Sequence, residues 1–348
     1  MQKRTRNRFI GGIVAGLALV TLSLTVFGPQ VRDYFSELAL FNQNEVVVVT
    51  HDSAAFPQEL LDEFKAETGL TVTQLKAGDT GSMVNKLVLT KDAPIGDMVY
   101  GIDNTFSAVA LNNNILEQLP AAEAGKLLEE INFADVCINY DKEWFSINEI
   151  APPKTIADLT KPAYQGLTVL TNPTTSSPGL AFLASTVAIF GDAGWPQYWQ
   201  ALKLNDVKIA SGWEDAYFTD FSGSSGKGDY PIVLSYTTSP AFEIRNNGES
   251  QTASFLNDCF RQREFAGILK NAKNPSGAQK FITFMTQLKF QEALPDSNYV
   301  YPILAEAKLP PAWTDFAPAA KTTVGAELQI DASRKTWFTQ WGQIFDVN

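Results

Sequence analysis

The chain has 348 residues, of which 45% are hydrophobic and 19% charged, with a formal net charge of −11. This composition supports a packed core and excludes wholesale disorder, and the length accommodates about two domains of ordinary size. The acidic balance argues against nucleic-acid binding, because that affinity comes from Lys and Arg contacts to phosphate.

The N-terminus carries an export signal of some kind. Four basic residues lie among the first eight, and residues 9–27 are apolar and uncharged. A helix of this length reaches roughly 28 Å and can span a bilayer, and the positive-inside rule exports the rest of the chain. The stretch ends in a poor small-x-small cleavage site. Residues 1–29 are therefore expected to be an uncleaved membrane anchor, with a cleaved signal peptide as the alternative, and residues 30–44 a connector.

The chain contains two cysteines, Cys137 and Cys259, and one histidine, His51. Two cysteines in an exported chain are expected to form a disulfide, with two buried free thiols as the alternative. A metal site is not expected, because no other metal ligands stand near the cysteines at the spacing that a metal site needs.

The first part of the chain alternates strand and helix patterns. Apolar and β-branched runs predict buried strands, and apolar residues at helical spacing predict helices between them. The expected order is strand 46–49, helix 57–68, strand 70–73, helix from about 79 to 89, and strand 97–101. This β-α-β-α-β order predicts a doubly wound α/β lobe.

The second part of the chain also contains strand and helix patterns. The expected elements are strands 166–170, 207–210 and 231–236, and helices 178–190, 275–295 and 331–346. Two further extended segments, 135–140 and 259–265, are expected to cross between lobes, and each carries one cysteine. Lobe 1 is then residues 45–135 and 260–348, and lobe 2 is residues 136–259.

Three helix starts are rich in hydroxyl groups and follow strands, at residues 79–82, 172–180 and 235–240. Free backbone N–H groups at such starts bind anions, and open α/β sheets bind ligands at the carboxyl ends of their strands. Ordinary helix capping is the alternative for any one of them.

Aromatic residues alternate with these turns. Trp213, Tyr217, Tyr236, Tyr299 and Tyr301 could form walls for a flat or cationic ring, or pack in the core. Neither a Gly-x-Ser-x-Gly motif nor a P-loop occurs in the sequence, so an enzyme is not expected.

Five segments together resemble the thiamine-binding periplasmic proteins: 101–104, 175–179, 212–217, 234–241 and 298–302. Their order and spacing hold from about residue 45 to the C-terminus. The run Ser-Tyr-Thr-Thr-Ser-Pro-Ala at 235–241 is the most specific. The resemblance implies a two-lobed type II periplasmic-binding fold that closes over thiamine or its phosphates. It also implies an extracytoplasmic monomer without a cofactor, which delivers its ligand to an ABC permease with its ATPase.

The resemblance also assigns ligand contacts. Asp79 matches a ligand-contacting acid and Thr80 its neighbour, while Ser176 and Ser177 match hydroxyls on the phosphate side. The remaining matched contacts are Trp213, Tyr236, Thr237, Thr238, Ser239, Pro240 and Tyr299. Further candidates are His51, Asp103, Asp215 and Tyr217.

The sequence departs from the family pattern at four places, the first of which is Thr80, where the family has a Gly. Tyr299 stands where the family can carry a Trp, and His51 where a Tyr can stand. Before the first crossing, Asn132-Phe133-Ala134 replaces an acidic Asp-Tyr-Gly. A carboxylate missing there would weaken recognition of a cationic ring.

Three other functions remain alternatives. A binding protein of the same fold could take ferric iron or a polyamine, but no Tyr-Tyr pair occurs here to hold iron. A thiamine-cleaving enzyme of similar fold would use a cysteine nucleophile, for which Cys137 is the candidate. A membrane-anchored sensor would bind thiamine without transporting it.

Overall fold

The computed structural model describes residues 44–120, 125–224 and 228–346. The predicted anchor and all but the last residue of the predicted connector lie outside these residues. Within them, no helix combines the length and the apolar character needed to cross a membrane. The residues from Val46 onward form one compact unit.

The first half of the sheet follows the predicted β-α-β-α-β order. Its elements are β1 (Glu45–Thr50), α2 (Gln58–Thr68), β2 (Thr71–Lys76), α3 (Thr80–Leu89), β3 (Met98–Asp103) and α4 (Ser107–Asn112). Strands β1 and β3 are parallel, and β1 lies between β2 and β3. Helix α2 ends where predicted, because Gly69 adopts the left-handed conformation that glycine enters without steric cost.

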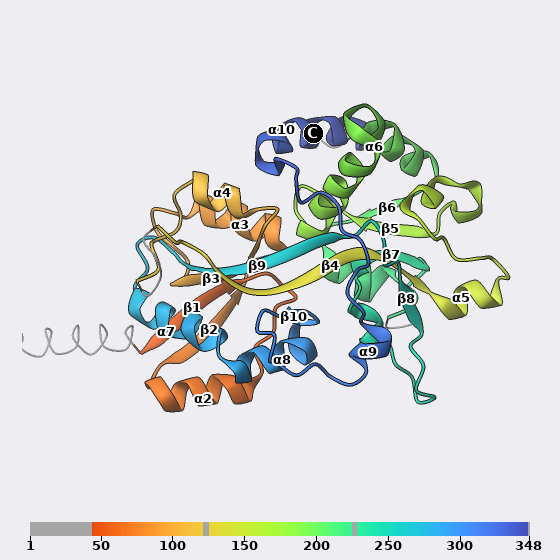
Figure 1. The fold of residues 1–348 in the computed structure, drawn as a ribbon. Coiled ribbons are helices and arrows are strands. Elements are labelled where there is room, and N and C mark those ends of the chain that lie inside the picture. The colour runs from red at the N-terminus through yellow and green to blue at the C-terminus, as the bar shows by residue number, and fades with distance from the viewer. Residues whose placement is uncertain (1–43, 121–124, 225–227, 347–348) are drawn as a thin grey trace, which may run out of the picture. The chain divides into compact units, whose positions relative to one another are not determined.

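Two long strands, β4 (Glu129–Asp141) and β9 (Phe260–Ile268), run side by side from one half of the sheet to the other (Figure 1). They pair antiparallel with each other, and the full strand order is β2-β1-β3-β9-β4-β7-β5-β6. The two predicted crossing segments are thus confirmed as parts of longer strands.

The second half contains β5 (Thr168–Thr171), β6 (Lys208–Ala210) and β7 (Ile232–Tyr236), with β5 parallel to both neighbours. Its remaining elements are α5 (Lys142–Ile147), the short helices η1 (Ile156–Thr160), η2 (Pro162–Tyr164), η3 (Asp215–Asp220) and η4 (Ser239–Phe242), and β8 (Thr252–Ser254). Helix α6 (Ser177–Leu204) is interrupted at Gly191, whose φ of 69° and ψ of 172° are not helical. The predicted helix end at residue 190 is therefore a real break, after which a second helical segment begins.

The C-terminal part differs from the prediction in two ways. The single predicted helix 275–295 is two helices, α7 (Pro275–Met285) and α8 (Leu288–Asn298), followed by β10 (Tyr301–Pro302) and α9 (Trp313–Phe316). The sequence places helix α10 (Ile330–Phe345) with lobe 1, but it packs against α6 of the second half (Figure 1). The rings of Trp341 and Trp199 meet there edge to face at 6.0 Å. The other lobe boundaries stay a prediction.

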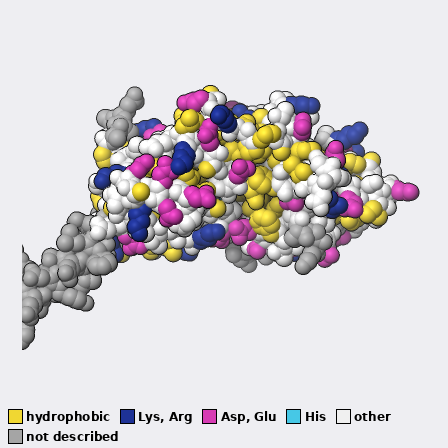
Figure 2. Space-filling model, turned by 90° about the horizontal axis from the view of Figure 1, so that it is seen from below, with side chains coloured by type: hydrophobic (Ala, Val, Ile, Leu, Met, Phe, Trp, Pro, Cys, Tyr) yellow, Lys and Arg dark blue, Asp and Glu magenta, His cyan; other side chains and the backbone are white. Residues whose placement is uncertain are grey.

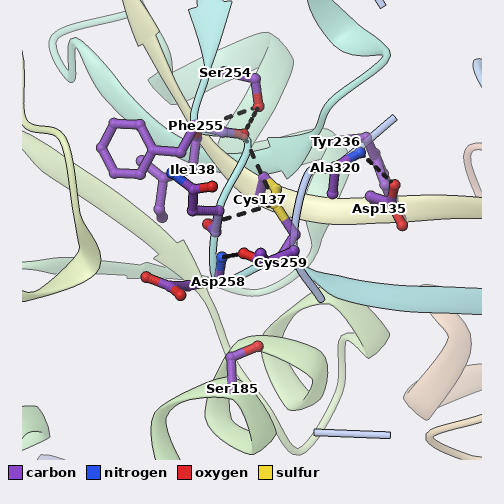
Figure 3. The surroundings of a disulfide bond; sticks show 12 residues. Asp135, Cys137, Ile138, Ser185, Tyr236, Ser254, Phe255, Asp258, Cys259 and Ala320 are labelled. Atoms are coloured by element: carbon purple, nitrogen blue, oxygen red, sulfur yellow. Dashed lines mark hydrogen bonds between the residues drawn. A yellow bond between two sulfur atoms is a disulfide. The ribbon is translucent and has the colours of Figure 1, made fainter. Parts of the chain in front are cut away.

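The predicted disulfide between Cys137 and Cys259 is present where β4 and β9 pair (Figure 3). Val136 lies opposite Phe260 in the antiparallel register, which brings the two cysteine Cα atoms to 4.8 Å. Both cysteines are buried. The bond cross-links the two strands that join the halves of the sheet.

Loss of this bond is expected to lower the free energy of unfolding by about 2–4 kcal/mol, because the bond closes a long loop in the unfolded chain. Urea unfolding of the Cys137→Ser, Cys259→Ser double variant measures the loss. As a control, the denatured but unreduced native protein should contain no titratable thiol. Two titratable thiols in that sample would contradict the disulfide.

Candidate ligand-binding cleft

Two cavities of about 230 Å³ each lie at the carboxyl ends of the parallel strands, where the sequence predicts a site. The first, here called the acidic cavity, is lined by Asp52, Ser53, Gly78, Asp79, Ser82, Thr175, Ser211, Gly212, Trp213, Glu214 and Asp215. The second, the aromatic cavity, is lined by His51, Ser53, Ala55, Trp213, Glu214, Phe218, Tyr236, Glu264, Ser297, Asn298, Tyr299 and Val300. They share Ser53, Trp213 and Glu214 and together form the cleft.

Asp79 ties the two halves of the sheet together across the acidic cavity. Its carboxylate caps α3 by accepting from the Thr80 N–H at 2.6 Å, and it also accepts from the Trp213 N–H at 2.9 Å and the Ser177 N–H at 3.4 Å. Burial raises the pKa of this carboxyl, while the hydrogen bond from Trp213 opposes the rise. The predicted contact residue is therefore in the cleft, but its oxygens are occupied by backbone donors.

Thr80, Ser176 and Ser177 are buried beside Asp79 and do not line the cavities. The Thr80 hydroxyl donates to the Gly101 carbonyl at 3.1 Å, and the Ser177 hydroxyl accepts from the Gln262 side chain at 3.4 Å. The first bond ties α3 to β3, and the second ties the start of α6 to β9.

Trp213 forms the wall common to both cavities. Its ring stacks on Tyr217, with centroids 5.0 Å apart and planes 16° apart, and it lies 5.8 Å from the Tyr236 ring. The indole N–H donates to the Ser235 hydroxyl at 2.9 Å. Tyr217 is buried behind the indole and donates to Glu243, so it supports Trp213 without lining the cleft.

The run from Tyr236 to Pro240 presents one ring to the cleft. Tyr236 lines the aromatic cavity, whereas Thr237 and Pro240 line a separate cavity of about 280 Å³. The Thr238 hydroxyl donates to the Tyr299 carbonyl at 2.5 Å, and the Ser239 hydroxyl lies 2.8 Å from that of Ser235. The hydroxyls of Thr238 and Ser239 thus hold the aromatic wall in place.

Tyr299 closes the aromatic cavity from the end of α8. It adopts a left-handed backbone conformation with φ of 62°, and its ring packs against Phe242. The neighbouring Asn298 side chain accepts from the Ala55 N–H at 2.9 Å and donates to the Ala55 carbonyl at 2.8 Å. These bonds fix the end of α8 against the loop that follows β1.

Replacing Tyr299 by Ala is expected to weaken ligand binding by about 3- to 10-fold, since one aromatic wall is worth roughly 0.5–1.5 kcal/mol. Tyr299→Phe keeps the ring and should bind like the native protein. Calorimetric titration of both variants measures the difference. Equal affinities for the Ala and Phe variants would show that the ring does not contact the ligand.

A buried carboxylate that the sequence did not single out, Glu264, faces the aromatic cavity from β9. It pairs directly with Asn132 of β4, whose side-chain amide donates to it at 3.0 Å and to the Tyr100 hydroxyl at 2.7 Å. The carboxylate missing at Asn132 is thus present on the adjacent strand. Successive residues of a strand face opposite sides, and Glu264 shares the buried side of β9 with Phe260 and Gln262.

His51 lies against Glu264, with 3.4 Å between the imidazole Nε2 and the carboxylate. Its other nitrogen is 2.9 Å from the Ser53 hydroxyl. Burial alone would lower the pKa of His51, but the charge of Glu264 raises it above its ordinary value. Burial alone would raise the pKa of Glu264, but the charge of His51 lowers it below its ordinary value. The pair places an ionised carboxylate at the base of the cavity.

The His51–Glu264 pair is expected to stabilise the fold more at about pH 6 than at about pH 9. Because the pKa of His51 is raised in the folded protein, the pair contributes its full stability below the unfolded-state pKa of about 6.5. This contribution is lost as the pH rises through the folded-state pKa. Urea unfolding of the native protein and of His51→Gln at both pH values measures it. If His51→Gln lowered the free energy of unfolding by the same amount at both pH values, the pairing would be contradicted.

The two remaining candidates lie in different places. Asp103 is buried at the end of β3, where it accepts from the Thr105 hydroxyl at 2.8 Å and the Phe106 N–H at 3.1 Å. Burial raises its pKa to about 7, and it lines neither cavity. Asp215 lines the acidic cavity and accepts from the Ser211 hydroxyl.

Comparisons with known proteins identify the family of the chain. The family model for bacterial extracellular solute-binding proteins matches residues 59–322. The thiamine-binding periplasmic protein of Escherichia coli K12 is 28% identical over 318 residues, covering 87% of this chain and 94% of that protein. That of Haemophilus influenzae is 27% identical over 328 residues, covering 88% of this chain and 94% of that protein.

Solved structures share the fold. A periplasmic thiamin binding protein matches with a TM-score of 0.75 at 26% identity, over 87% of this chain and 96% of that one. Iron-bound HitA from Pseudomonas aeruginosa matches with a TM-score of 0.67 at 18% identity, over 86% of this chain and 99% of that one, which shows the fold alone. The predicted resemblance and the type II periplasmic-binding fold are confirmed, and the chain belongs to the bacterial extracellular solute-binding proteins.

Proposed function

We propose that this protein captures thiamine or a thiamine phosphate in the cleft and delivers it to an ABC permease with its ATPase. The observation that carries the proposal is the aromatic cavity, where the aromatic side chains of Trp213, Phe218, Tyr236 and Tyr299 share the lining with the buried carboxylate of Glu264. Thiamine has a flat, positively charged thiazolium ring, and aromatic faces and carboxylates both attract such a ring.

Each part of the cleft has a proposed role. Trp213, Tyr236 and Tyr299 form the walls for the rings, and Glu264 supplies the charge opposite the thiazolium. Asp79 holds the two halves together while adding negative charge beside the ligand, which favours a cation over a neutral molecule.

The proposed role is binding without catalysis, by a monomer that needs no cofactor. Cys137, the nucleophile that a thiamine-cleaving enzyme would need, is bonded to Cys259, which supports a structural role. Iron-bound HitA shares the fold, but the thiamine-binding relatives match this chain at higher identity.

We also propose that residues 1–29 tether the protein to the outer side of the cytoplasmic membrane. The support is the basic cluster and apolar stretch of the sequence. Sequencing the N-terminus of the mature protein tests the tether, and a mature start near residue 30 would contradict it.

Calorimetric titration of the purified protein tests the binding proposal. Thiamine or one of its phosphates should bind at one site per chain, while ferric iron and spermidine should not compete for it. If none of the three thiamine compounds binds, the proposal is wrong. Loss of labelled thiamine uptake in cells that lack the protein tests the transport step and distinguishes it from sensing.

A further inference from the structure

Resting on the proposed function, we propose that His51 couples ligand binding to proton release, because the positive charge of the ligand replaces the proton of His51 beside Glu264. The observation is that the one histidine of the chain and this carboxylate line the same cavity. The His51 Nε2 and Glu264 Oε1 atoms are 3.4 Å apart, and the two side chains are 12% and 8% exposed. A cation that enters the aromatic cavity therefore meets a carboxylate that already has a partner.

Glu264 is held more closely at one carboxylate oxygen than at the other. Its Oε2 accepts from the Asn132 amide at 3.0 Å. Its Oε1 accepts from the Gln262 amide at 3.4 Å, the same distance at which it lies from the His51 ring. Both contacts of Oε1 are long for hydrogen bonds to a charged group. Oε1 is therefore the oxygen that a bound cation can approach.

The His51 ring is held in its place beside this oxygen. Its Nδ1 lies 2.9 Å from the Ser53 hydroxyl, and its ring packs against Gly101, where a Cβ atom would overlap it. Gly101 has a φ of 95°, which glycine adopts without strain. Because the ring is fixed, a protonated His51 and a bound cation lie close together and repel each other. Transfer of the proton to the solvent leaves a neutral imidazole and removes the repulsion.

The direction of the pH dependence follows from the empty protein. Burial alone would lower the pKa of His51, but the charge of Glu264 raises it above the ordinary value of about 6.5. The imidazole is therefore protonated at about pH 6 and loses its proton as the pH rises. A ligand cation beside it lowers this pKa again, so binding at low pH includes the cost of removing the proton. Thiamine should bind more weakly as the pH falls.

Other titratable groups surround His51. They are Asp52 beside it in the chain, Asp79 at the start of α3, Tyr100 of β3, and Glu214 and Tyr236, which line the same cavity. Burial raises the pKa of Tyr100 and of Tyr236 well above the ordinary value, so both stay neutral near pH 7. Asp103, whose pKa burial raises to about 7, is a second group that titrates near neutral pH.

The exposed charges do not supply the effect. Figure 2 shows Asp, Glu, Lys and Arg side chains mixed over one outer face of the molecule. Groups of these kinds keep their charge near pH 7 when exposed, because their ordinary pKa values lie below about 5 or above about 10. A proton that is released on binding near pH 7 therefore comes from a buried group such as His51 or Asp103.

The test is calorimetric titration of the full chain with thiamine at about pH 6 and about pH 8. The dissociation constant should be about 10-fold larger at the lower pH. Titration near neutral pH in PIPES and in imidazole, which differ in ionisation enthalpy, counts the protons, and about 0.5 to 1 should be released per thiamine bound. Equal affinity at the two pH values, or no proton release, overturns this inference and leaves the proposed function intact. Absence of binding at both pH values overturns both.

Two variants identify the source of the proton. His51→Gln has no proton to displace, so it should bind thiamine equally at the two pH values and release none. Asp103→Asn removes the other group that titrates near neutral pH, at a site that lines neither cavity, and should keep the native pH dependence. Proton release that persists in His51→Gln, or disappears in Asp103→Asn, would contradict the role given to His51. If a variant does not fold, the proton count of the native protein decides.

Discussion

Glu264→Gln is expected to weaken thiamine binding by at least roughly 30-fold, which corresponds to about 2 kcal/mol or more. The substitution removes the charge at the base of the aromatic cavity and keeps the size and shape of the side chain. It also leaves His51, which is mostly buried, without its counterion, so the loss includes a cost beyond the contact with the ligand. Calorimetric titration measures the change.

The matched control is Glu130→Gln on the neighbouring strand. Glu130 is partly exposed and pairs with Arg263, away from both cavities. This variant should bind thiamine like the native protein, because an exposed ion pair contributes little. If Glu264→Gln bound thiamine within about 3-fold of the native protein, Glu264 would not be the partner of the ligand's positive charge.

Trp213→Ala is expected to abolish measurable binding and to lower the free energy of unfolding by about 3–5 kcal/mol. The indole is the wall common to both cavities and lies between Tyr217 and Tyr236. Its removal leaves the Ser235 hydroxyl without the indole donor. Urea unfolding and calorimetric titration of one preparation separate the two effects.

Trp341→Ala is the control for a purely structural effect. Trp341 is buried between α10 and α6, lines neither cavity, and contacts Trp199 and Phe345. This variant should lose comparable stability while its folded fraction binds thiamine with native affinity. Native affinity in Trp213→Ala would contradict the place given to the ring.

The elements that sequence patterns predict well are those whose signals are local. The apolar run of β1, the glycine that ends α2 and the Asp79 cap of α3 all appear where their chemistry indicates. The break between α7 and α8 escapes the sequence pattern because a tertiary contact accompanies it. The Gln291 side chain donates at 2.9 Å both to the Met285 carbonyl at the end of α7 and to the Ile131 carbonyl of β4.

In the cleft, too, local signals were predicted correctly and long-range pairings were not. The strand ends and the aromatic residues Trp213, Tyr236 and Tyr299 are predicted from the sequence and do meet. The sequence could not tell that Thr237 faces a different cavity, since that depends on the pairing of β7 with β4. Nor could it place Glu264 beside Asn132, because the two strands are more than a hundred residues apart and neither strand's own sequence determines how they pair.

The proposed mode of binding puts the thiazolium ring in the aromatic cavity, against Glu264 and between Trp213, Tyr236 and Tyr299. A crystal structure of the protein with thiamine is the decisive test. We expect ring density among those three aromatic side chains. Thiamine bound outside the cleft, or with its ring in the acidic cavity away from Glu264, would contradict this mode of binding.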